Sequence, residues 1–421
     1  MTGERVGLAF LGADTVGAPT IEETVRLASS ENLEIRGVLV RDLSKQRAFD
    51  LPVTTDFEQI INDPDVKIVV SLLGDESVEH PYILEALRRG KFVVTANKEI
   101  IAKGAPQLFS EAQNHQVGLL FEAAAAGGIQ VVDNLINRYS HNTFSSFAGI
   151  VNGTTNHMLT EMAKGKDYQT ALQEAQEAGF AEPDPTNDVE GYDARYKLSI
   201  IASLAFKNYI SPDQIHVEGI TGLEVGDFEY ASRLGYVIKL IAFARKVDGE
   251  LELWVAPALA PTDHPLAKIN GSLNGLFFDA NPIGSFTLQG RGAGGGPTAS
   301  AVLSDILSAR DHILNQSTPR AVNLSEPLTV KPFDRVRNRH FIRMVMSEDP
   351  GTLSKVSGVL GNCGVGIHAV EQEEDKTDGK VAECVFTTHE SEEGQIRAMV
   401  EEISRSDISA QVKSVLRILP K

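Results

Sequence analysis

Apolar and polar positions follow two different periodicities along the first third of the chain. Five short apolar runs have the length and composition of buried strands, and the segments between them carry apolar residues at helical spacing. Strands that alternate with helices predict an α/β fold with a doubly wound parallel sheet and right-handed crossovers. The predicted strands are residues 6–11, 33–40, 66–73, 92–95 and 117–121, and helices are predicted from residue 21 onward and over 81–89.

Beyond about residue 131 the pattern changes to longer helical stretches and short strands, which predicts a mixed α+β domain. A stretch over 318–338 carries three prolines and predicts a connector. The rest of the chain predicts a small βαββαβ unit, the ferredoxin-like arrangement. The α+β helices are expected at 168–179 and 193–206, with short strands such as 147–151 and 251–257; the last unit has strands at 341–346, 367–371, 382–387 and 411–418 and helices at 351–361 and 392–404.

Length and charge narrow the class of protein. The 421 residues predict two or three domains, and 39 basic against 57 acidic side chains give a formal net charge of −18. This acidic balance opposes binding to nucleic acids and to anionic membranes. No apolar run is long enough to span a bilayer and no signal-peptide pattern is present, so a cytoplasmic protein is expected. Cys363 and Cys384 are too few for a disulfide framework and are expected to be buried or idle thiols.

The segment from Gly12 to Gly17 follows the first predicted strand and opens the first helix, which is the place of a dinucleotide-binding loop. Its middle glycine is replaced by Asp14, so a plain strand-to-helix turn remains an alternative. Arg41 and Lys45 follow the second strand, where cations accommodate the 2′-phosphate of NADP. A solvated surface arginine is the alternative, and the neighbouring Asp42 leaves room for NAD.

An acidic segment holds five carboxylates before any basic residue appears, at positions 182, 184, 188, 190 and 193. Pro183, Pro185 and Gly191 are expected to prevent a regular helix there. Asp193 and Lys197 are four residues apart and share a helix face. The segment is either a solvated acidic loop with an ordinary ion pair, or a site where carboxylates capture an ammonium group and a lysine handles a proton.

Two glycine-rich segments, 151–156 and 290–298, each follow a strand and precede a helix. Backbone amides at such places can bind anions, although structural turns have a similar composition. Five segments in order then closely resemble homoserine dehydrogenase, in its longer form with a C-terminal ACT regulatory domain. The matching segments are 94–98, 122–129, 149–156, 181–197 and 292–300.

The resemblance implies NAD(P)-dependent interconversion of L-homoserine and L-aspartate 4-semialdehyde, in threonine and methionine biosynthesis. Glu182 and Asp188 would bind the substrate ammonium, and amides around Gly153 and Thr154 its carboxylate. Lys98 and Lys197 correspond to the paired lysines of the family, with Lys197 held by Asp193. Which of the two donates the proton stays open; burial or a neighbouring cation would lower a lysine pKa toward neutrality. The cofactor residues expected are Gly12, Thr15, Val16, Gly17, Arg41, Lys45, Gly74, Thr95, Lys98 and Gly294.

The resemblance also implies a structural monovalent cation, usually sodium, bound by the Glu122 carboxylate and backbone carbonyls. The carbonyls expected are those of Ala125, Gly127 and Ile129. In the tail, Asp349, Gly351 and Leu353 lie in a segment that resembles the effector loop of ACT domains, with threonine as the expected effector. The alternative is a tail that only mediates oligomerisation. A homodimer or homotetramer is expected.

The implied domains are a Rossmann-type nucleotide domain, 1–130; a substrate-binding and dimerisation domain, 131–318, whose part from about 290 returns to the nucleotide domain; a linker, 319–338; and an ACT domain, 339–421. Asp14 is the main departure from the family pattern. An inward carboxylate about 4 Å from a phosphate would cost roughly 1 kcal/mol in water and roughly 4 at a dielectric of 20. The expectation is an active enzyme whose loop is displaced or whose cofactor is held by Arg41 and the 294–296 loop. The alternatives are a catalytically silent amino-acid sensor and an oxidoreductase for another amino-acid semialdehyde.

Overall fold

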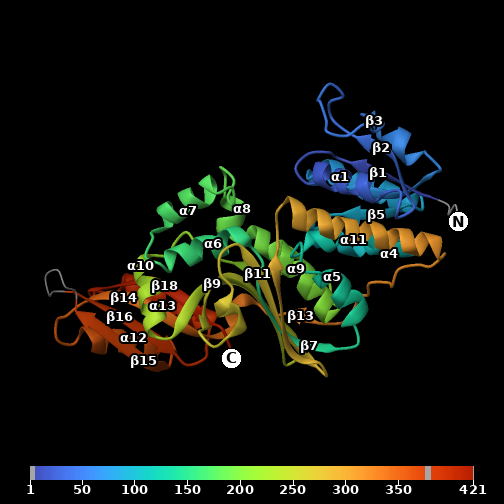
Figure 1. The fold of residues 1–421 in the computed structure, drawn as a ribbon. Helices are drawn as coiled ribbons and strands as arrows, with labels where there is room; N and C mark the ends of the chain where they lie inside the picture. Colours follow the sequence, from blue (N-terminus) through green and yellow to red (C-terminus); the bar gives the residue numbers. More distant parts are fainter. Residues whose placement is uncertain (1–4, 375–380, 421) are drawn as a thin grey trace.

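The computed structural model describes residues 5–374 and 381–420. The molecule is elongated, with the N-terminal sheet at one end and the C-terminal unit at the other (Figure 1). The N-terminal sheet has the order β3-β2-β1-β4-β5-β6, and all its strands are parallel. This confirms the predicted doubly wound sheet, whose strand order is that of the Rossmann fold. Its strands are β1 (Val6–Leu11), β2 (Leu33–Leu39), β3 (Val53–Thr54), β4 (Val66–Ser71), β5 (Phe92–Thr95) and β6 (Leu119–Leu120).

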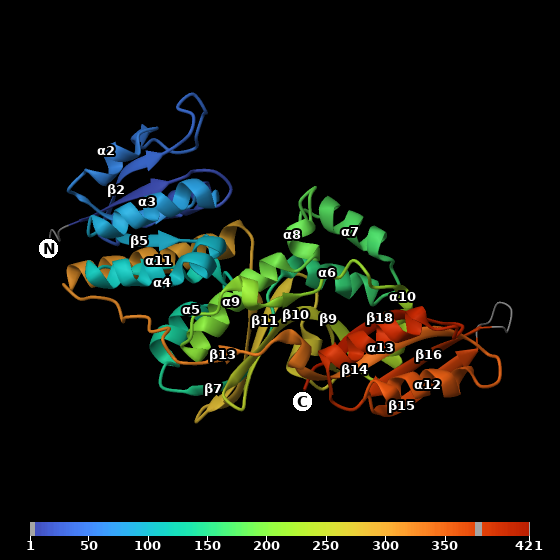
Figure 2. The same ribbon diagram turned by 180° about the vertical axis from the view of Figure 1, so that it is seen from behind.

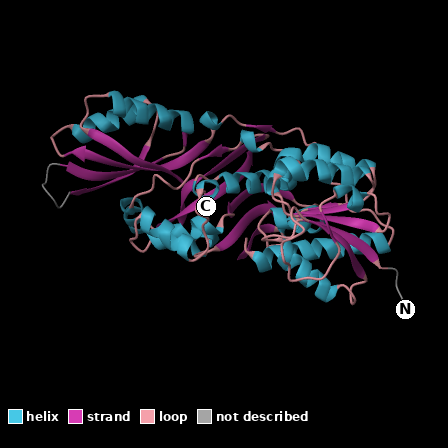
Figure 3. Cartoon of the chain, turned by 90° about the horizontal axis from the view of Figure 1, so that it is seen from above, coloured by secondary structure: helices cyan, strands magenta, loops and turns pink. Residues whose placement is uncertain are grey.

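Helices cover both faces of this sheet (Figure 3). Along β1, Leu8 and Phe10 belong to one hydrophobic core and Ala9 and Leu11 to another, because successive side chains of a strand point to opposite faces. All four side chains are fully buried. The apolar run that predicted the strand therefore reflects burial on both sides. The helices are α1 (Gly17–Leu27), α2 (Phe57–Ile61), α3 (Glu76–Arg88), α4 (Lys98–Asn114) and the distant α11 (Gly295–Leu314).

Helix α1 differs from the sequence pattern, whereas α11 returns to the nucleotide domain as expected. Helix α1 begins at Gly17 rather than at residue 21, because its first turn, Gly-Ala-Pro-Thr, carries no large apolar residue that would extend the helical pattern. A Cβ at Gly17 would lie 2.4 Å from the Gly12 carbonyl oxygen, so this tight turn requires glycine. Helix α11 returns from far along the chain, and its Val302 and Ile306 join the same core as Leu8. The connector that follows α11 runs toward the C-terminal unit (Figure 2).

The second sheet has the order β12-β11-β7-β9-β10-β18-β14-β16-β15 along its main path. Its central strands are longer than predicted, since β7 has 8 residues and β10 has 12. Pro257 was expected to end the second of these, yet pairing with β9 continues to Pro261 opposite Tyr236. The strands are β7 (Thr143–Ile150), β9 (Tyr236–Val247), β10 (Glu250–Pro261), β11 (Leu273–Asn281) and β12 (Gly284–Arg291), and the helices of this domain are α5 (Val131–Asp133), α6 (Gly153–Met162), α7 (Tyr168–Glu177), α8 (Thr186–Val189), α9 (Tyr192–Phe206) and α10 (Val225–Arg233).

The C-terminal unit has the predicted βαββαβ order, and its strands are arranged β18-β14-β16-β15, the ferredoxin-like order. Helices α12 and α13 pack against one another beside these strands. The prediction for this unit is therefore confirmed at the level of topology. Its main elements are β14 (Arg337–Ser347), α12 (Thr352–Asn362), β15 (Ile367–Glu374), β16 (Val381–Thr388), α13 (Glu393–Arg405) and β18 (Ala410–Ile418).

The sequence had predicted a separate C-terminal domain, but in the structure this unit shares a sheet with the preceding domain. Strand β18 pairs with β10, with Ala258 opposite Arg417, so one sheet runs through both parts. The expected connector also contains a short strand, β13 (Thr329–Val330), which pairs with the start of β10. Long-range pairing of this kind leaves no mark in local periodicity, which explains the difference.

The two cysteines are free thiols, as expected. Cys384 is buried, and burial raises its pKa to about 11. In the described residues no helix combines the length and the apolar character that crossing a membrane requires.

Candidate functional site

Asp193 lies between two lysine ammonium groups that come from different domains. Its Oδ2 is 2.7 Å from Lys197 Nζ, one turn further along α9, as the four-residue spacing predicted. Its Oδ1 is 2.9 Å from Lys98 Nζ, at the first residue of α4. Lys197 also donates to the Val151 carbonyl at 2.9 Å. Both expected catalytic lysines therefore contact Asp193 where the nucleotide domain meets the substrate domain, a usual place for an active site.

This cluster is largely closed to solvent, with side-chain exposures of 7% for Asp193, 11% for Lys197 and 36% for Lys98. Burial alone would raise the pKa of Asp193, but the charges of Lys197 and Lys98 outweigh it and lower this pKa. The Asp193 charge in turn raises the pKa of Lys98, against the effect of burial. The expectation that burial lowers the pKa of a site lysine is therefore wrong for Lys98, which keeps its proton at neutral pH.

Asn152 links this cluster to the acidic segment, a role that sequence reasoning missed. Its amide nitrogen donates to Asp193 Oδ2 at 2.9 Å and to Asp188 Oδ1 at 2.6 Å. Its amide oxygen accepts from Thr155 N–H at 2.9 Å and so caps the start of α6. Burial and the nearby Asp193 raise the pKa of Asp188. The Asn-Gly-Thr-Thr sequence at a helix start was the only available indication.

The rest of the acidic segment is arranged partly as expected. The proline-rich stretch was expected to exclude helix, yet Thr186–Val189 forms one turn directly after Pro185. Proline lacks only its own N–H, which the first turn of a helix does not use. Gly153 begins α6, where a Cβ would lie 2.7 Å from the Ser272 carbonyl, and Thr154 donates to the Phe180 carbonyl at 2.7 Å. Glu182 is exposed, and the described residues show no side-chain contact between it and Asp193 or Asp188.

A buried glutamate on α3 positions the start of α4. Glu79 is fully buried and accepts hydrogen bonds from Gly74 N–H at 3.0 Å, Thr95 Oγ1 at 3.2 Å and Asn97 Nδ2 at 2.9 Å. Asn97 caps α4, whose first residue is Lys98. Two expected cofactor residues, Gly74 and Thr95, are thus linked through the Glu79 carboxylate to the start of α4, where the expected catalytic residue Lys98 lies. A charged residue on the apolar face of a helix was the indication that sequence reasoning overlooked.

A cavity of about 190 Å³ lies at the carboxyl ends of β1, β2 and β4. Dinucleotides bind at this edge of a doubly wound sheet. The cavity is lined by Gly12, Asp14, Arg41 and Lys45 together with apolar residues of the strand ends. A Cβ at Gly12 would lie 2.7 Å from the Leu72 carbonyl, and φ there is +100°, so the loop requires glycine at this position. The residues present fit a nicotinamide dinucleotide.

The other expected cofactor residues surround the start of α1. Thr15 and Val16 precede its first residue, Gly17. Gly294 caps α11 with φ of +110°. A Cβ placed on the next residue, Gly295, would lie 3.8 Å from Pro19 Cγ in α1. Two glycine-rich helix starts therefore face the same region, and such ends bind anions.

Glu122 lies in a tight loop after β6 and is 2% exposed. Its carboxylate accepts from Val132 N–H at 2.9 Å and Asp133 N–H at 2.7 Å, while its own N–H donates to buried Asp305. Burial raises the pKa of Glu122 to about 7 and that of Asp305 well above its ordinary value. In the described part of the chain neither acid has a basic partner. Buried acids of this kind are either neutral, as the raised pKa values describe, or balanced by a bound cation.

The carbonyl residues expected around that cation lie in the same loop. Ala126 and Gly127 both have positive φ, and a Cβ at Gly127 would lie 2.5 Å from the Gly292 carbonyl. Ala125 and Ile129 are buried on either side. The loop thus needs glycine at 127 because it is pressed against the segment that precedes α11.

The expected effector residues lie between β14 and α12. Asp349 accepts from Ser347 Oγ at 2.7 Å, and Gly351 caps α12 with φ of +97°. Leu353 is 40% exposed. The loop is thus accessible to a ligand or to a second copy of the unit.

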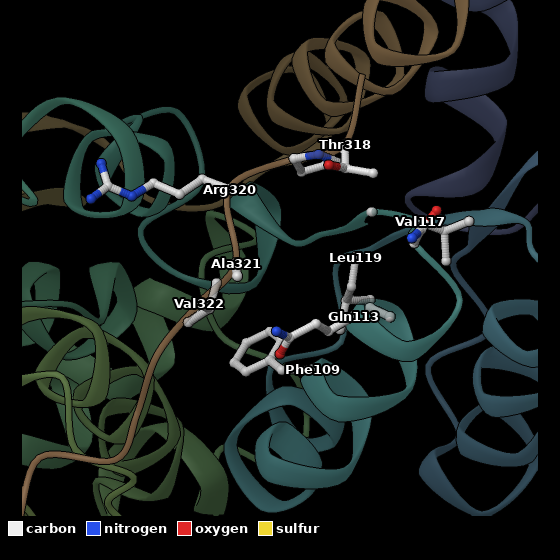
Figure 4. Close-up of a pocket in the computed structure, with 12 residues that line it drawn as sticks. Phe109, Gln113, Val117, Leu119, Thr318, Arg320, Ala321 and Val322 are labelled. Atoms are coloured by element: carbon white, nitrogen blue, oxygen red, sulfur yellow. The ribbon is translucent and has the colours of Figure 1, made fainter. Parts of the chain in front are cut away.

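A cavity of about 450 Å³ lies away from the lysine cluster, between the end of α4, β6 and the chain after α11 (Figure 4). Phe109 and Leu119 line it from one side and Thr318 and Ala321 from the other. Its one charged side chain, Arg320, points away in Figure 4 and donates to Ser140 Oγ at 2.6 Å. This cavity brings together none of the groups that a dehydrogenase reaction needs.

Comparison with known proteins agrees with this arrangement. Residues 12–122 match the model of the homoserine dehydrogenase NAD-binding domain, and residues 131–307 match the model of homoserine dehydrogenase. The chain is 39% identical to homoserine dehydrogenase of Synechocystis sp. (strain PCC 6803), with 98% of this chain and 99% of the relative covered.

Solved structures give the same result. A homoserine dehydrogenase from Thiobacillus denitrificans has a TM-score of 0.91 at 33% identity, covering 99% of this chain and 98% of its own. The Staphylococcus aureus enzyme has a TM-score of 0.78 at 28% identity, covering 99% and 100%. The chain therefore belongs to the homoserine dehydrogenase family of oxidoreductases.

Proposed function

We propose that the Asp193 cluster is where this enzyme interconverts L-homoserine and L-aspartate 4-semialdehyde, in threonine and methionine biosynthesis. The observation that carries the proposal is a buried carboxylate held between the ammonium groups of Lys98 and Lys197. Oxidising an alcohol to an aldehyde removes a hydride from carbon and a proton from oxygen. A bound nicotinamide supplies or accepts the hydride, and the protein must handle the proton.

Lys197 is the proposed proton carrier. In the direction of reduction its ammonium gives a proton to the aldehyde oxygen and becomes a neutral amine; in the direction of oxidation the amine takes the hydroxyl proton. Asp193 holds this lysine in place and balances its charge. Lys98, whose pKa is raised, stays charged and orients the substrate oxygen electrostatically.

The acidic segment and the start of α6 would bind the two ends of the substrate backbone. Asp188, joined by Glu182, attracts the ammonium group, while the amides of Gly153 and Thr154 at a helix start bind the carboxylate. Asn152 contacts both Asp188 and Asp193, so it sets the distance between the binding and proton-transfer positions.

The cofactor is a nicotinamide dinucleotide, which we place along the loop of Gly12 to Gly17. Arg41 and Lys45 lie where cations accommodate the 2′-phosphate of NADP, and NAD is the alternative cofactor. The remaining residues proposed to line its path are Thr15, Val16, Gly74, Thr95, Lys98 and Gly294.

One assay tests these assignments. We expect NADPH or NADH absorbance to fall with L-aspartate 4-semialdehyde, and NADP⁺ or NAD⁺ to be reduced with L-homoserine. Threonine is expected to inhibit both directions. Turnover only with a differently sized amino-acid semialdehyde would contradict the substrate proposal, and full activity at high threonine would contradict the effector.

Sodium is the proposed structural cation, bound by the Glu122 carboxylate and the carbonyls of Ala125, Gly127 and Ile129. We expect sodium at about 100 times its Kd to raise the melting temperature by roughly 3 °C. The comparison is with choline at equal ionic strength, followed by thermal denaturation. The Glu122→Gln variant should lose this difference; an equal rise in the variant would contradict the site.

The C-terminal unit is proposed to be an ACT domain that binds threonine at Asp349, Gly351 and Leu353, in a homodimer or homotetramer. The exposed Leu353 beside an αL glycine supports a site that a second copy completes. The domain limits remain those expected from the sequence, and a cytoplasmic location remains a prediction.

A further inference from the structure

Asp14 stands where a dinucleotide-binding loop has its second glycine, and its side chain faces the cations that follow β2. Its Oδ1 is 2.7 Å from Lys45 Nζ, and its Oδ2 is 3.4 Å from Arg41 Nη2. The side chain of Asp14 is 55% exposed, so these pairs lie at the mouth of the 190 Å³ cavity and not in a core. The carboxylate thus occupies both cations that a cofactor 2′-phosphate would use.

The other charged groups at this cavity are engaged elsewhere. Arg47 donates to the carbonyls of Lys45 and Asp42, each at 2.7 Å. The Asp42 carboxylate accepts from the N–H and hydroxyl of Ser44, at 2.8 and 2.7 Å. The hydrogen bond from Lys45, supported by Arg41, lowers the pKa of Asp14, which is therefore ionised at neutral pH. Asp14 is the acid that neutralises the phosphate-binding cations directly.

A phosphate monoester carries a charge of about −1.5 to −2 near neutral pH. To bind here, the 2′-phosphate of NADP must draw Lys45 and Arg41 away from Asp14 or lie beside its carboxylate, and both are unfavourable. The 2′-hydroxyl of NAD carries no charge and can donate a hydrogen bond to a carboxylate. The same aspartate therefore acts differently on the two cofactors.

We propose that Asp14 is a specificity-determining residue, which competes with the 2′-phosphate of NADP for Lys45 and Arg41 and so shifts the cofactor preference of this enzyme toward NAD. The inference rests on the proposed function in one respect only, the presence of a nicotinamide dinucleotide in this cavity.

The test is equilibrium binding of NADPH and NADH to the full chain, followed by cofactor fluorescence. Asp14→Asn keeps the shape of the side chain and removes its charge. We expect it to lower the Kd of NADPH by about five- to fiftyfold, while the Kd of NADH changes little. Glu22→Gln is the matched control, since it removes an exposed acid of α1 that lies near Lys45 but forms no ion pair with either cation in the described residues. That variant should leave the ratio of the two Kd values close to the wild-type ratio.

A second measurement isolates the competition itself. Lys45→Met is expected to weaken NADPH binding more in the Asp14→Asn background than in the wild type, because Asp14 no longer neutralises Lys45 there. Equal losses in the two backgrounds would overturn the inference. If Asp14→Asn folds poorly, Asp14→Gly restores the usual loop residue, and NADH binding reports whether the cavity is intact.

The remaining outcomes separate this inference from the proposed function. Equal improvement for NADPH and NADH would place Asp14 at the pyrophosphate, which both cofactors share, and would overturn the inference alone. No change for either cofactor would do the same. Failure of the wild type and both variants to bind any nicotinamide dinucleotide would overturn the inference together with the proposed function.

Discussion

Replacing Lys197 by methionine is expected to lower kcat by about 10²- to 10⁴-fold while the KM for homoserine changes little. Methionine matches the apolar stem of lysine and fills the same space, so the change removes chiefly the ammonium group. That group contacts Asp193 and the Val151 carbonyl and is largely shielded from solvent. Steady-state kinetics in both directions measures the effect.

Lys239→Met is the matched control for this substitution. Lys239 is 1% exposed and donates to Asn156 and Asn270 side chains and to the Ile269 carbonyl, away from the Asp193 cluster. The same change at this second buried lysine should lower the melting temperature but leave kcat close to wild type. If the Lys197 variant kept its turnover, Lys197 would not be the proton carrier, and that role would be assigned to Lys98.

The parts of this site that lie close together in sequence could be predicted from sequence. Asp193 and Lys197 are one helical turn apart, and the periodicity that predicted α9 also placed them on one face. The glycines at 12 and 17 could be placed because a tight strand-to-helix turn leaves no space for side chains. The alternation of strands and helices was sufficient for the parallel sheet, since burial on both faces leaves continuous apolar runs.

Contacts between distant segments could not be predicted in this way. Lys98 reaches Asp193 only because the sheet brings the start of α4 against α9. Asn152 serves as a helix cap and as a donor to two carboxylates, and its sequence suggests only the first role. The pairing of β18 with β10 likewise joins two parts that local patterns had separated.

Asp14 shows how a contact between segments changes the meaning of a residue. Taken alone, an aspartate beside a phosphate site implies repulsion of the pyrophosphate or an outward rotamer. In the structure Asp14 instead forms ion pairs with Lys45 and Arg41, which were interpreted from the sequence as unpaired cations. Two observations that were separate in the sequence therefore describe a single ion-pair cluster.

The joint between the substrate domain and the C-terminal unit depends on a buried charge network. Arg343 of β14 is 2% exposed and donates to Asp227 at 2.8 Å, to Glu224 at 2.5 Å and to Glu383 at 3.0 Å. Asp227, on α10, is fully buried and also accepts from Glu224 N–H and from Ser414 Oγ. Removing one partner from such a network leaves a buried charge without full compensation.

Asp227→Ala is therefore expected to reduce the free energy of unfolding by about 3 kcal/mol, which corresponds to a fall in melting temperature of roughly 3–5 °C. Asp227→Asn keeps the shape and should recover part of the loss, because the amide oxygen still accepts one hydrogen bond. Differential scanning calorimetry measures both variants. Since β18 continues the sheet of β10, the loss should appear in the unfolding of both parts together.

Asp334→Ala is the control for this second prediction. Its carboxylate also forms two hydrogen bonds to an arginine, Arg397, at 2.6 and 2.7 Å, but the side chains are 53% and 60% exposed. Exposed pairs of this kind contribute about 0–1 kcal/mol, since water solvates the remaining charge. A similar fall in melting temperature for both alanine variants would show that burial of Arg343 and Asp227 adds nothing. A large difference would locate the strength of this joint in its desolvated charges, since the two pairs share the same chemistry and differ in exposure.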